Sequence, residues 1–177
     1  MPSFASSTQP TDRNCATGAY KRHWGGSGEK PDDTAQAAYD PAAAPGAQFR
    51  SVTCAKVAKD GTVYVCDRGN DRIQAFDKSG KLLKQGAVSK TTRGTGSVWD
   101  IAFSRDPQQR FLYVADGHDQ KVFIVRRDTL ETVGSFGDGG RYPGTFYGVG
   151  SVAVDSKGNV YTGETLEGKR VQKFIPK

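Results

Sequence analysis

The sequence is poor in the residues on which metal and disulfide chemistry usually depends. Among 177 residues it has two histidines, His23 and His118, and three cysteines, Cys15, Cys54 and Cys66. Two histidines rule out a histidine-rich metal site within one chain, and three cysteines without a C-x-x-C pair make no disulfide framework. A Ser-His-Asp spacing, a phosphate-binding loop and a nucleotide fingerprint are absent as well, so the common motifs of nucleophilic catalysis and nucleotide binding are missing.

Long apolar runs and concentrated charge are also missing. No run approaches the length of a membrane-spanning helix. Residues 1–16 lack the basic start and apolar stretch of a signal peptide, and we expect a disordered arm there. The formal net charge is +6, but the 25 lysines and arginines are scattered, which favours a solvated surface over a nucleic-acid footprint. We therefore expect neither a membrane nor a nucleic acid as partner, while the cellular location stays open.

What the chain does contain is a repeat. The stretch YVCDRGNDRIQAF from Tyr64 recurs as YVADGHDQKVFIV from Tyr113 and, more loosely, as YTGETLEGKRVQKF from Tyr161. The three tyrosines are 49 and 48 residues apart. A period in the forties indicates a repeat architecture, and each copy reads as strand, polar loop and alternating strand.

The repeats predict short strands separated by turns, with 22 glycines and no helical pattern. A four-stranded antiparallel meander at this period is typical of a β-propeller blade. The fold class is therefore all-β, with three blades per chain. We expect strands at 52–58, 62–66, 72–77 and 81–85, at 98–104, 111–115, 121–126 and 131–136, and at 149–155, 160–162 and 170–174.

The third repeat lacks an outer strand, while residues 17–25 resemble an outer strand without a blade. Because three blades are too few to close a ring, the chain is expected to form a homodimer with six blades, in which each N-terminal strand completes the last blade of the partner. The expected organisation is a disordered arm at 1–16, an outer strand at 17–25, a Gly/Pro/Ala-rich loop at 26–48, the first blade at 49–86, a loop and the second blade at 87–137, and a loop and the third blade at 138–177.

The repeats resemble NHL repeats over residues 17–174. The segments that carry this resemblance are DGTVYVCDRGNDRIQAF, RFLYVADGHDQKVFIV and GNVYTGETLEGKRVQKF. The chain is similar to the C-terminal half of bacterial six-bladed propellers related to peptidyl-hydroxyglycine amidating lyases. Such lyases hold a metal with histidines near the entries of the inner strands, where this chain has Thr53, Trp99 and Gly150. The resemblance also implies that full-length relatives are often exported.

Chain direction predicts where a site would lie. The loop that enters each first strand and the loop between the second and third strands meet on one face, and propeller sites use this face. The carboxylates of Asp100 and Glu164 are the best placed there, and oxygen ligands suit a divalent cation such as Ca²⁺, Mg²⁺ or Mn²⁺. Zn²⁺ is the ion that the lyase resemblance adds, and no organic cofactor is expected. The candidate residues are Asp100, His118 and Glu164 for catalysis, Asp100 and Glu164 for the metal, and Arg68, Trp99 and Tyr147 for the ligand.

Two functions follow from these residues. One is a hydrolase of esters, lactones or phosphotriesters, or a lyase, in which the bound cation polarises an oxygen and activates water. The alternative is a non-catalytic scaffold that binds a protein or a small molecule. Structural roles are the alternative for several loop residues. In the first repeat Asp67 and Asn70 are expected to close the loop and Arg72 to pack on the neighbouring blade, and Trp99 either stacks on a ligand or plugs the axis.

Cys54 and Cys66 lie on adjacent predicted strands. If the connecting loop Lys59-Asp60-Gly61 has three residues, the two thiols face each other and a disulfide is possible. If it has two, they face opposite sides of the sheet. Free, half-buried thiols are the more economical prediction.

Overall fold

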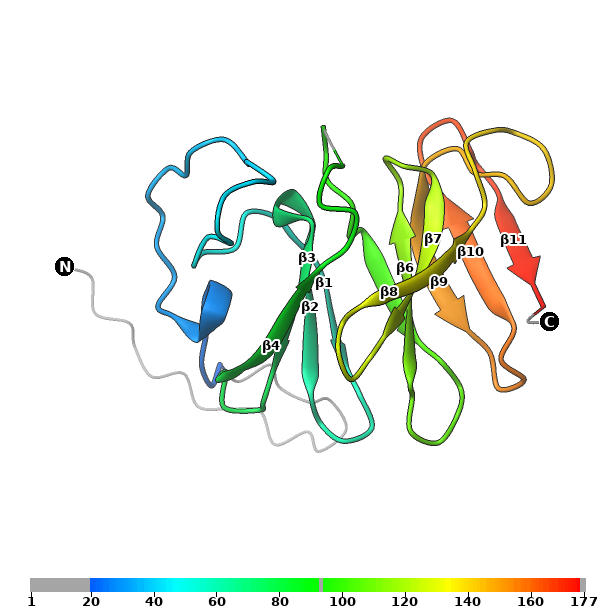
Figure 1. The fold of residues 1–177 in the computed structure, drawn as a ribbon. Coiled ribbons are helices and arrows are strands. Elements are labelled where there is room, and N and C mark those ends of the chain that lie inside the picture. Colours follow the sequence, from blue (N-terminus) through cyan, green and yellow to red (C-terminus); the bar gives the residue numbers. More distant parts are fainter. Residues whose placement is uncertain (1–19, 93, 176–177) are drawn as a thin grey trace, which may run out of the picture.

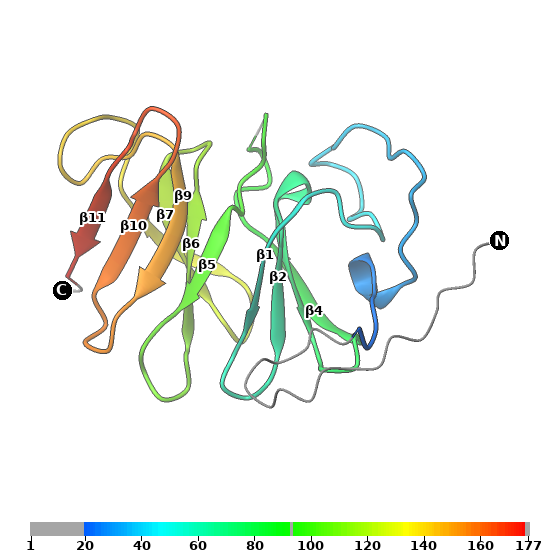
Figure 2. The ribbon, with the colours of Figure 1, turned by 180° about the vertical axis from the view of Figure 1, so that it is seen from behind.

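The computed structural model describes residues 20–92 and 94–175, and these form three antiparallel sheets that stand side by side (Figures 1 and 2). In each sheet the strands follow one another in chain order. The first sheet holds β1 (Val52–Val57), β2 (Val63–Asp67), β3 (Arg72–Phe76) and β4 (Leu82–Ala87), the second holds β5 (Asp100–Phe103), β6 (Phe111–Asp116), β7 (Lys121–Arg126) and β8 (Thr132–Phe136), and the third holds β9 (Val149–Val154), β10 (Val160–Glu164) and β11 (Val171–Phe174).

These sheets are the three predicted blades, and the eleven strands predicted within the blades are all present with their ends shifted by at most two residues. Among the first strands of the blades, β5 contacts both β1 and β9, and the three strands lie at the front in Figure 2. The only helical elements in the described residues are two short 3-10 turns, η1 (Gly26–Gly28) and η2 (Arg68–Asn70). None of the described residues forms a helix long and apolar enough to cross a membrane.

The hairpins at the lower end of the blades are set by aspartate and glycine. The Oδ1 atom of Asp77 accepts hydrogen bonds from the backbone N–H groups of Ser79 (2.7 Å) and Lys81 (3.0 Å), and Gly80 then takes a φ of 92°. Asp155 repeats the arrangement in the third blade, where its Oδ1 atom accepts from the backbone N–H groups of Lys157 and Asn159 and the φ of Gly158 is 86°. A side chain with Cβ is strained at such positive φ values, which explains why the sequence places glycine there.

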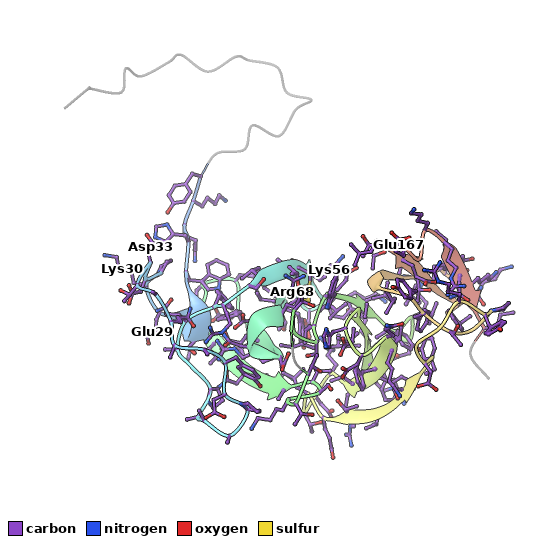
Figure 3. The ribbon with its side chains drawn as sticks, turned by 90° about the horizontal axis from the view of Figure 1, so that it is seen from above. Glu29, Lys30, Asp33, Lys56, Arg68 and Glu167 are labelled. Carbon is purple, nitrogen blue, oxygen red and sulfur yellow. A yellow bond between two sulfur atoms is a disulfide. The ribbon has the colours of Figure 1, made fainter. Side chains whose placement is uncertain are left out.

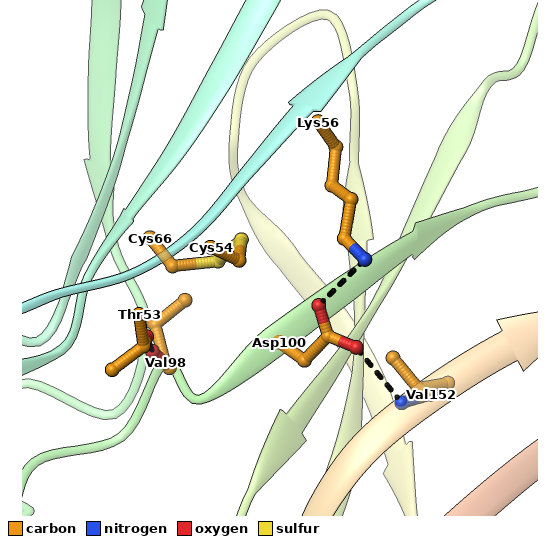
Figure 4. The surroundings of a disulfide bond; sticks show 7 residues. All are labelled: Thr53, Cys54, Lys56, Cys66, Val98, Asp100 and Val152. Atoms are coloured by element: carbon orange, nitrogen blue, oxygen red, sulfur yellow. Dashed lines mark hydrogen bonds and ion pairs between the residues drawn. A yellow bond between two sulfur atoms is a disulfide. The ribbon is translucent and has the colours of Figure 1, made fainter.

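The two cysteines of the first blade form a disulfide (Figure 4). Ala58 N–H donates to the carbonyl of Thr62, so the β1–β2 loop has three residues and Cys54 lies opposite Cys66 in the register. Their Cα atoms are 4.9 Å apart. The prediction of free thiols is therefore wrong. The length of the connecting loop decides whether the two cysteines lie on the same face of the sheet, and with three residues they do.

Two apolar cores hold the three blades together. Between the first and second blades, Tyr64 and Ile73 pack against Ile101 and Leu112, all with at most 1% of their surface exposed. Between the second and third blades, the buried residues are Ala115, Val122, Phe146, Val149, Val152 and Val160. Each large side chain removed from water in this way contributes about 1.5–3 kcal/mol. The cores therefore fix the blades relative to one another.

The N-terminal part of the chain departs from the prediction. Residues 20–25 form no strand. They lie on the first blade instead, where Trp24 packs against Phe76 at 6.0 Å between ring centroids and Arg22 donates to the carbonyl of Lys78. Phe49 contacts Phe76 as well, so the segment before β1 covers part of the outward face of the first blade.

Nothing pairs with the outer edge of β11 among the described residues, and the third sheet has three strands. The apolar contacts of Trp24 with the first blade explain why residues 20–25 of the same chain are not at that edge. Residues 26–51 contain no strand. The predicted arm at 1–16 and residues 17–19 of the predicted outer strand lie outside the described residues.

Candidate functional site

The candidate site lies at the upper end of the blades as drawn in Figure 1. The loops between the second and third strands and the entries to β1, β5 and β9 are all at this end, while the hairpins are at the other. We call this end the upper face. It is the face on which chain direction places the candidate residues.

Asp100, the first residue of β5, is engaged by both neighbouring blades. Its Oδ1 atom lies 3.1 Å from Nζ of Lys56 on β1, and its Oδ2 atom accepts a hydrogen bond of 3.2 Å from the backbone N–H of Val152 on β9 (Figure 4). The side chain is 14% exposed. Asp100 thus links the three inner strands, and both of its oxygens have a protein partner.

Glu164, at the end of β10, is buried and fully engaged. Its Oε1 accepts from Nε of Arg170 at 2.6 Å and from Nε2 of Gln172 at 2.8 Å, and its Oε2 accepts from the backbone N–H of Tyr147 at 2.7 Å. Burial alone would raise the pKa of Glu164, but these hydrogen bonds outweigh burial and hold its pKa below the ordinary value. The carboxylate therefore closes the loop around Arg170.

The first blade contains the same motif. Asp67 accepts hydrogen bonds from Nε of Arg72 (2.8 Å), Nδ2 of Asn70 (2.7 Å) and the backbone N–H groups of Arg50 and Ser51. An acid at the end of the second strand, an arginine at the start of the third and a backbone N–H before the first strand recur in both blades. The predicted loop-closing role of Asp67 and Asn70 is confirmed, and Glu164 belongs to the same class. Arg72, which was expected to pack on the neighbouring blade, instead pairs with Asp67 inside its own blade.

The second blade breaks the motif. Asp116 pairs in register with Lys121, as Asp67 pairs with Arg72, but Nζ of Lys121 lies 2.8 Å from Asp138 instead. The Oδ1 atom of Asp116 accepts from the backbone N–H groups of His118 and Asp119, both at 2.9 Å. Its Oδ2 atom is buried and has no hydrogen-bond partner among the described residues. Burial raises the pKa of Asp116 to about 7, and the nearby carboxylates of Asp119 and Asp71 add to the effect.

Asp71 is a second buried acid with a partnerless oxygen. It lies in the β2–β3 loop with a φ of 49°, and its Oδ1 atom accepts from the backbone N–H of Ser97 at 2.8 Å. Burial raises the pKa of Asp71 to about 6. The sequence analysis did not single out either aspartate. For Asp116 the signal was present, since a lysine stands at 121 where the other repeats have arginine.

Arg68 and Trp99 are brought together as expected for ligand contacts. The Arg68 guanidinium carbon lies 4.8 Å from the Trp99 ring centroid, a cation–π arrangement. Trp99 Nε1 donates to the carbonyl of Gly96 at 2.9 Å, which fixes the ring. Within the described part of the chain, Nε of Arg68 has no partner and no carboxylate lies within salt-bridge distance of its guanidinium. Figure 3 looks down on this face and labels Arg68 and Lys56.

The other candidates are spread out. His118 is exposed, and its ring borders Gly94 in the preceding loop. The Arg141 guanidinium carbon lies over the Tyr147 ring, 4.6 Å from the ring centroid. No hydrogen bond among the described residues joins the His118 ring to Asp100 or Glu164, and no set of three His, Cys, Asp or Glu residues in 20–92 and 94–175 is arranged to hold a metal ion.

Comparison with known proteins supports the fold. No protein-family model matches the chain, and no curated protein does. Among solved structures, the chain is similar to the β-propeller domain of Cps50 (Swd1) from Myceliophteria thermophila, with 14% identity over 69% of this chain and a TM-score of 0.52. It is also similar to a streptogramin B lyase, with 12% identity over 71% of this chain and a TM-score of 0.50, and to hydrazine synthase from Kuenenia stuttgartiensis, with 15% identity over 63% and a TM-score of 0.50.

The chain spans 39%, 41% and 28% of these three structures, respectively. At such identities the likeness shows the fold alone. The fold is that of a β-propeller, of which this chain forms three blades.

Proposed function

We propose that the chain is a non-catalytic binding module built from NHL-type blades. The observation that carries this proposal is that Asp100 and Glu164, the two carboxylates best placed for catalysis, already have protein partners on every oxygen. A metal or a water would have to displace Lys56 or Arg170. Glu164 is buried, and removing its Arg170 partner costs about 3–5 kcal/mol, whereas the Lys56 side chain is 41% exposed and its pair with Asp100 contributes at most about 1 kcal/mol.

The proposed binding surface is the stack of Arg68 on Trp99. A guanidinium without a carboxylate partner, held on a fixed indole, suits a partner that carries a carboxylate, because the charge-assisted pair can be bidentate. The net charge of +6 works in the same direction by attracting acidic partners. We assign Tyr147 a secondary role, since its ring already holds Arg141.

The fluorescence of Trp99 can test this surface. The chain has two tryptophans, so the Trp24→Phe variant leaves Trp99 as the single reporter. We expect an acetylated hexaglutamate peptide to change the emission of this variant in a saturable way, and the additional substitution Arg68→Gln to weaken binding by roughly tenfold. Arg105→Gln, at an exposed arginine in the β5–β6 hairpin, is the control with the same change in charge. Equal binding with and without Arg68 would reject the surface.

Metal-assisted hydrolysis or lyase chemistry by Asp100, His118 and Glu164 is the competing prediction. It is distinguished by turnover of esters, lactones and phosphotriesters in the presence of Ca²⁺, Mg²⁺, Mn²⁺ or Zn²⁺. We expect the wild-type protein and the Asp100→Asn variant to match the buffer blank with each ion. Turnover that needs the ion and is lost in Asp100→Asn would show that the protein is an enzyme and would reject the non-catalytic binding module.

We also propose that two chains close a six-bladed ring. This proposal is supported by the open edge of β11 and by apolar side chains on the outward faces of the end blades, where Val57 is 63% and Val171 is 75% exposed. The expected mass by light scattering is twice that of the 19.1 kDa chain. A monomer at micromolar concentration would reject the ring and leave the binding surface untouched.

A further inference from the structure

The segment before β1 encloses a pocket on the first blade, away from the Arg68–Trp99 stack. Figure 1 shows residues between η1 and β1 as an arch beside this blade. Between the arch and the blade lies a hollow of about 530 Å³, a size typical of sites for small organic molecules. The wall on the arch side has an apolar part formed by Ala37, Ala38, Ala43, Ala44, Pro45 and Ala47, beside the polar side chains of Gln36, Tyr39, Asp40 and Gln48.

The arch is held open by hydrogen bonds at both ends. The buried Arg72 donates from Nη1 to the carbonyl of Gly46 (2.6 Å) and from Nη2 to the carbonyl of Gln48 (2.9 Å). At the other end, the Tyr39 hydroxyl donates to the carbonyl of Lys90 at 3.0 Å. Arg72 is itself held by Asp67 of the same blade, with 2.8 Å between Nε and Oδ2. Its hydrogen bonds therefore tie the end of the arch to the first blade. The alanines between the two ends are exposed rather than packed, so they leave an unfilled apolar surface in the hollow.

The opposite wall carries positive charge. Arg50 and Lys90 both line the pocket, and no carboxylate among the described residues lies within salt-bridge distance of either. The Arg50 stem packs over Gly69, where a Cβ would be 2.8 Å from its Cδ, and its Nε donates to Oδ1 of Asn70 at 3.1 Å. The guanidinium is thus oriented while its terminal nitrogens stay unpaired by any acid. The charge of Arg72 is balanced by Asp67, and Asp40 is the single acid in the lining.

We propose that this pocket binds a small organic anion, an apolar body of one or two rings that carries a carboxylate. The apolar body lies against the alanines of the arch, and the carboxylate pairs with Arg50, with Lys90 adding attraction at the rim. A guanidinium held by a side-chain hydrogen bond presents its fork to a carboxylate at low conformational cost. A cation of the same shape would meet two uncompensated positive charges and be rejected.

Three probes of one shape test the proposal: naphthalene-2-carboxylate, 2-naphthol and 2-naphthylmethylammonium, titrated calorimetrically into the full chain. We expect the carboxylate to bind at micromolar to submillimolar concentration, the naphthol at least tenfold more weakly, and the ammonium not at all. Equal binding of the three probes, or no binding of the carboxylate at millimolar concentration, would overturn the proposal.

Two variants locate the site. Arg50→Gln removes the charge. It is expected to weaken binding of the carboxylate probe roughly tenfold and to leave binding of the naphthol unchanged. Ala44→Trp keeps Arg50 but fills the hollow, and it is expected to weaken both probes. Arg105→Gln repeats the charge change on a distant hairpin and should bind like the wild-type protein. Thermal melts confirm that each variant is folded. Unchanged carboxylate binding by both folded pocket variants would show that the site lies elsewhere and reject the assignment.

Discussion

The buried Asp116 makes the stability of the protein depend on pH. The carboxyl titrates near 3.8 in its ordinary environment and near 7 in the folded chain. Between these values the folded state keeps a proton that the unfolded chain has lost, so stability is fully present at low pH and is lost as the pH rises through about 7. At 1.36 kcal/mol per pH unit, the loss from Asp116 between pH 4.5 and 8.5 is about 3 kcal/mol.

Asp116→Asn removes this dependence. The asparagine oxygen can still accept from the backbone N–H groups of His118 and Asp119, and an amide does not ionise. Its NH₂ group replaces an oxygen without a partner, and the penalty of about 1–3 kcal/mol for that group is the same at every pH. The informative quantity is therefore the change, between pH 4.5 and 8.5, in the stability of the variant relative to the wild-type protein, which we expect to be about 3 kcal/mol in favour of the variant.

The assay is urea unfolding followed by tryptophan fluorescence at both pH values, with linear extrapolation to water. Asp138→Asn is the matched control, because Asp138 is exposed and its surface pair with Lys121 contributes at most about 1 kcal/mol. The Asp71 carboxyl, whose pKa is about 6, adds a slope of the same sign to every variant. If the stability of Asp116→Asn relative to the wild-type protein changes by less than about 1 kcal/mol between pH 4.5 and 8.5, the claim that burial without a cationic partner raises the pKa of Asp116 is refuted.

Lys121→Arg tests the same reasoning from the other side. Lys121 lies opposite Asp116 in the register, at the position where Arg72 pairs with Asp67. A guanidinium there can reach the partnerless Oδ2 atom, and we expect stability at pH 8.5 to rise by about 1–3 kcal/mol. The loss of stability between pH 4.5 and 8.5 should shrink accordingly. A pH dependence equal to that of the wild-type protein would show that the cation is not what the second blade lacks.

Two further changes test the interactions that hold the blades. Reduction of the Cys54–Cys66 disulfide, which closes a loop with a sequence separation of 12, should lower the free energy of unfolding by about 3 kcal/mol; urea titrations with and without a phosphine reductant measure it, and no difference would mean that the bond does not form in solution. Arg170→Met leaves Glu164 buried without its cation and should destabilise the third blade by about 3–5 kcal/mol, an effect that Glu164→Gln in the same chain should partly reverse.

The strands could be predicted from the sequence because every blade repeats the same local signals. Alternating side chains and an aspartate that accepts backbone N–H groups recur in the hairpins of all three blades. The positive φ falls on glycine in the first and third blades and on Gln109 and Leu130 in the second. The loop-closing role of Asp67 and Asn70 followed from the repeat for the same reason, whereas the pairing of Asp67 with Arg72 was not predicted. The N-terminal strand could not be judged in this way, since the contact of Trp24 with Phe76 depends on tertiary packing.

The candidate site was predicted less well, because its interactions connect distant parts of the chain. The carboxylate of Asp100 accepts a hydrogen bond from the backbone of Val152, 52 residues away. The residues next to Asp100 in the sequence give no sign of this contact. The disulfide was not predicted because a difference of one residue in the length of the β1–β2 loop decides whether the two cysteines face each other. Asp116 illustrates the opposite case, since its missing arginine is visible in the sequence once the repeats are aligned on the acid that ends the second strand.

The two outward faces of the three-blade unit are unlike, and this difference can decide how copies assemble. The first blade exposes Ala55 and Val57 beside a region covered by Trp24 and Phe49. The third blade exposes Val171, which lies in register with Gly163, and leaves the edge of β11 unpaired. In a closed ring the first face of one copy meets the third face of the other. In a dimer built on the open third blade alone, the third faces meet each other.

The substitutions Val57→Lys and Val171→Lys separate these assemblies. A lysine in place of a buried valine loses about 1.5–3 kcal/mol of apolar burial and adds the desolvation of a charge. In a closed ring, both variants should therefore raise the dimer dissociation constant at least tenfold, because each face occurs in both interfaces. If only Val171→Lys weakens the dimer, the third faces meet and the ring is excluded. Neither residue lies in a described core, so thermal stability of the monomer should stay within about 1 kcal/mol and serves as the control.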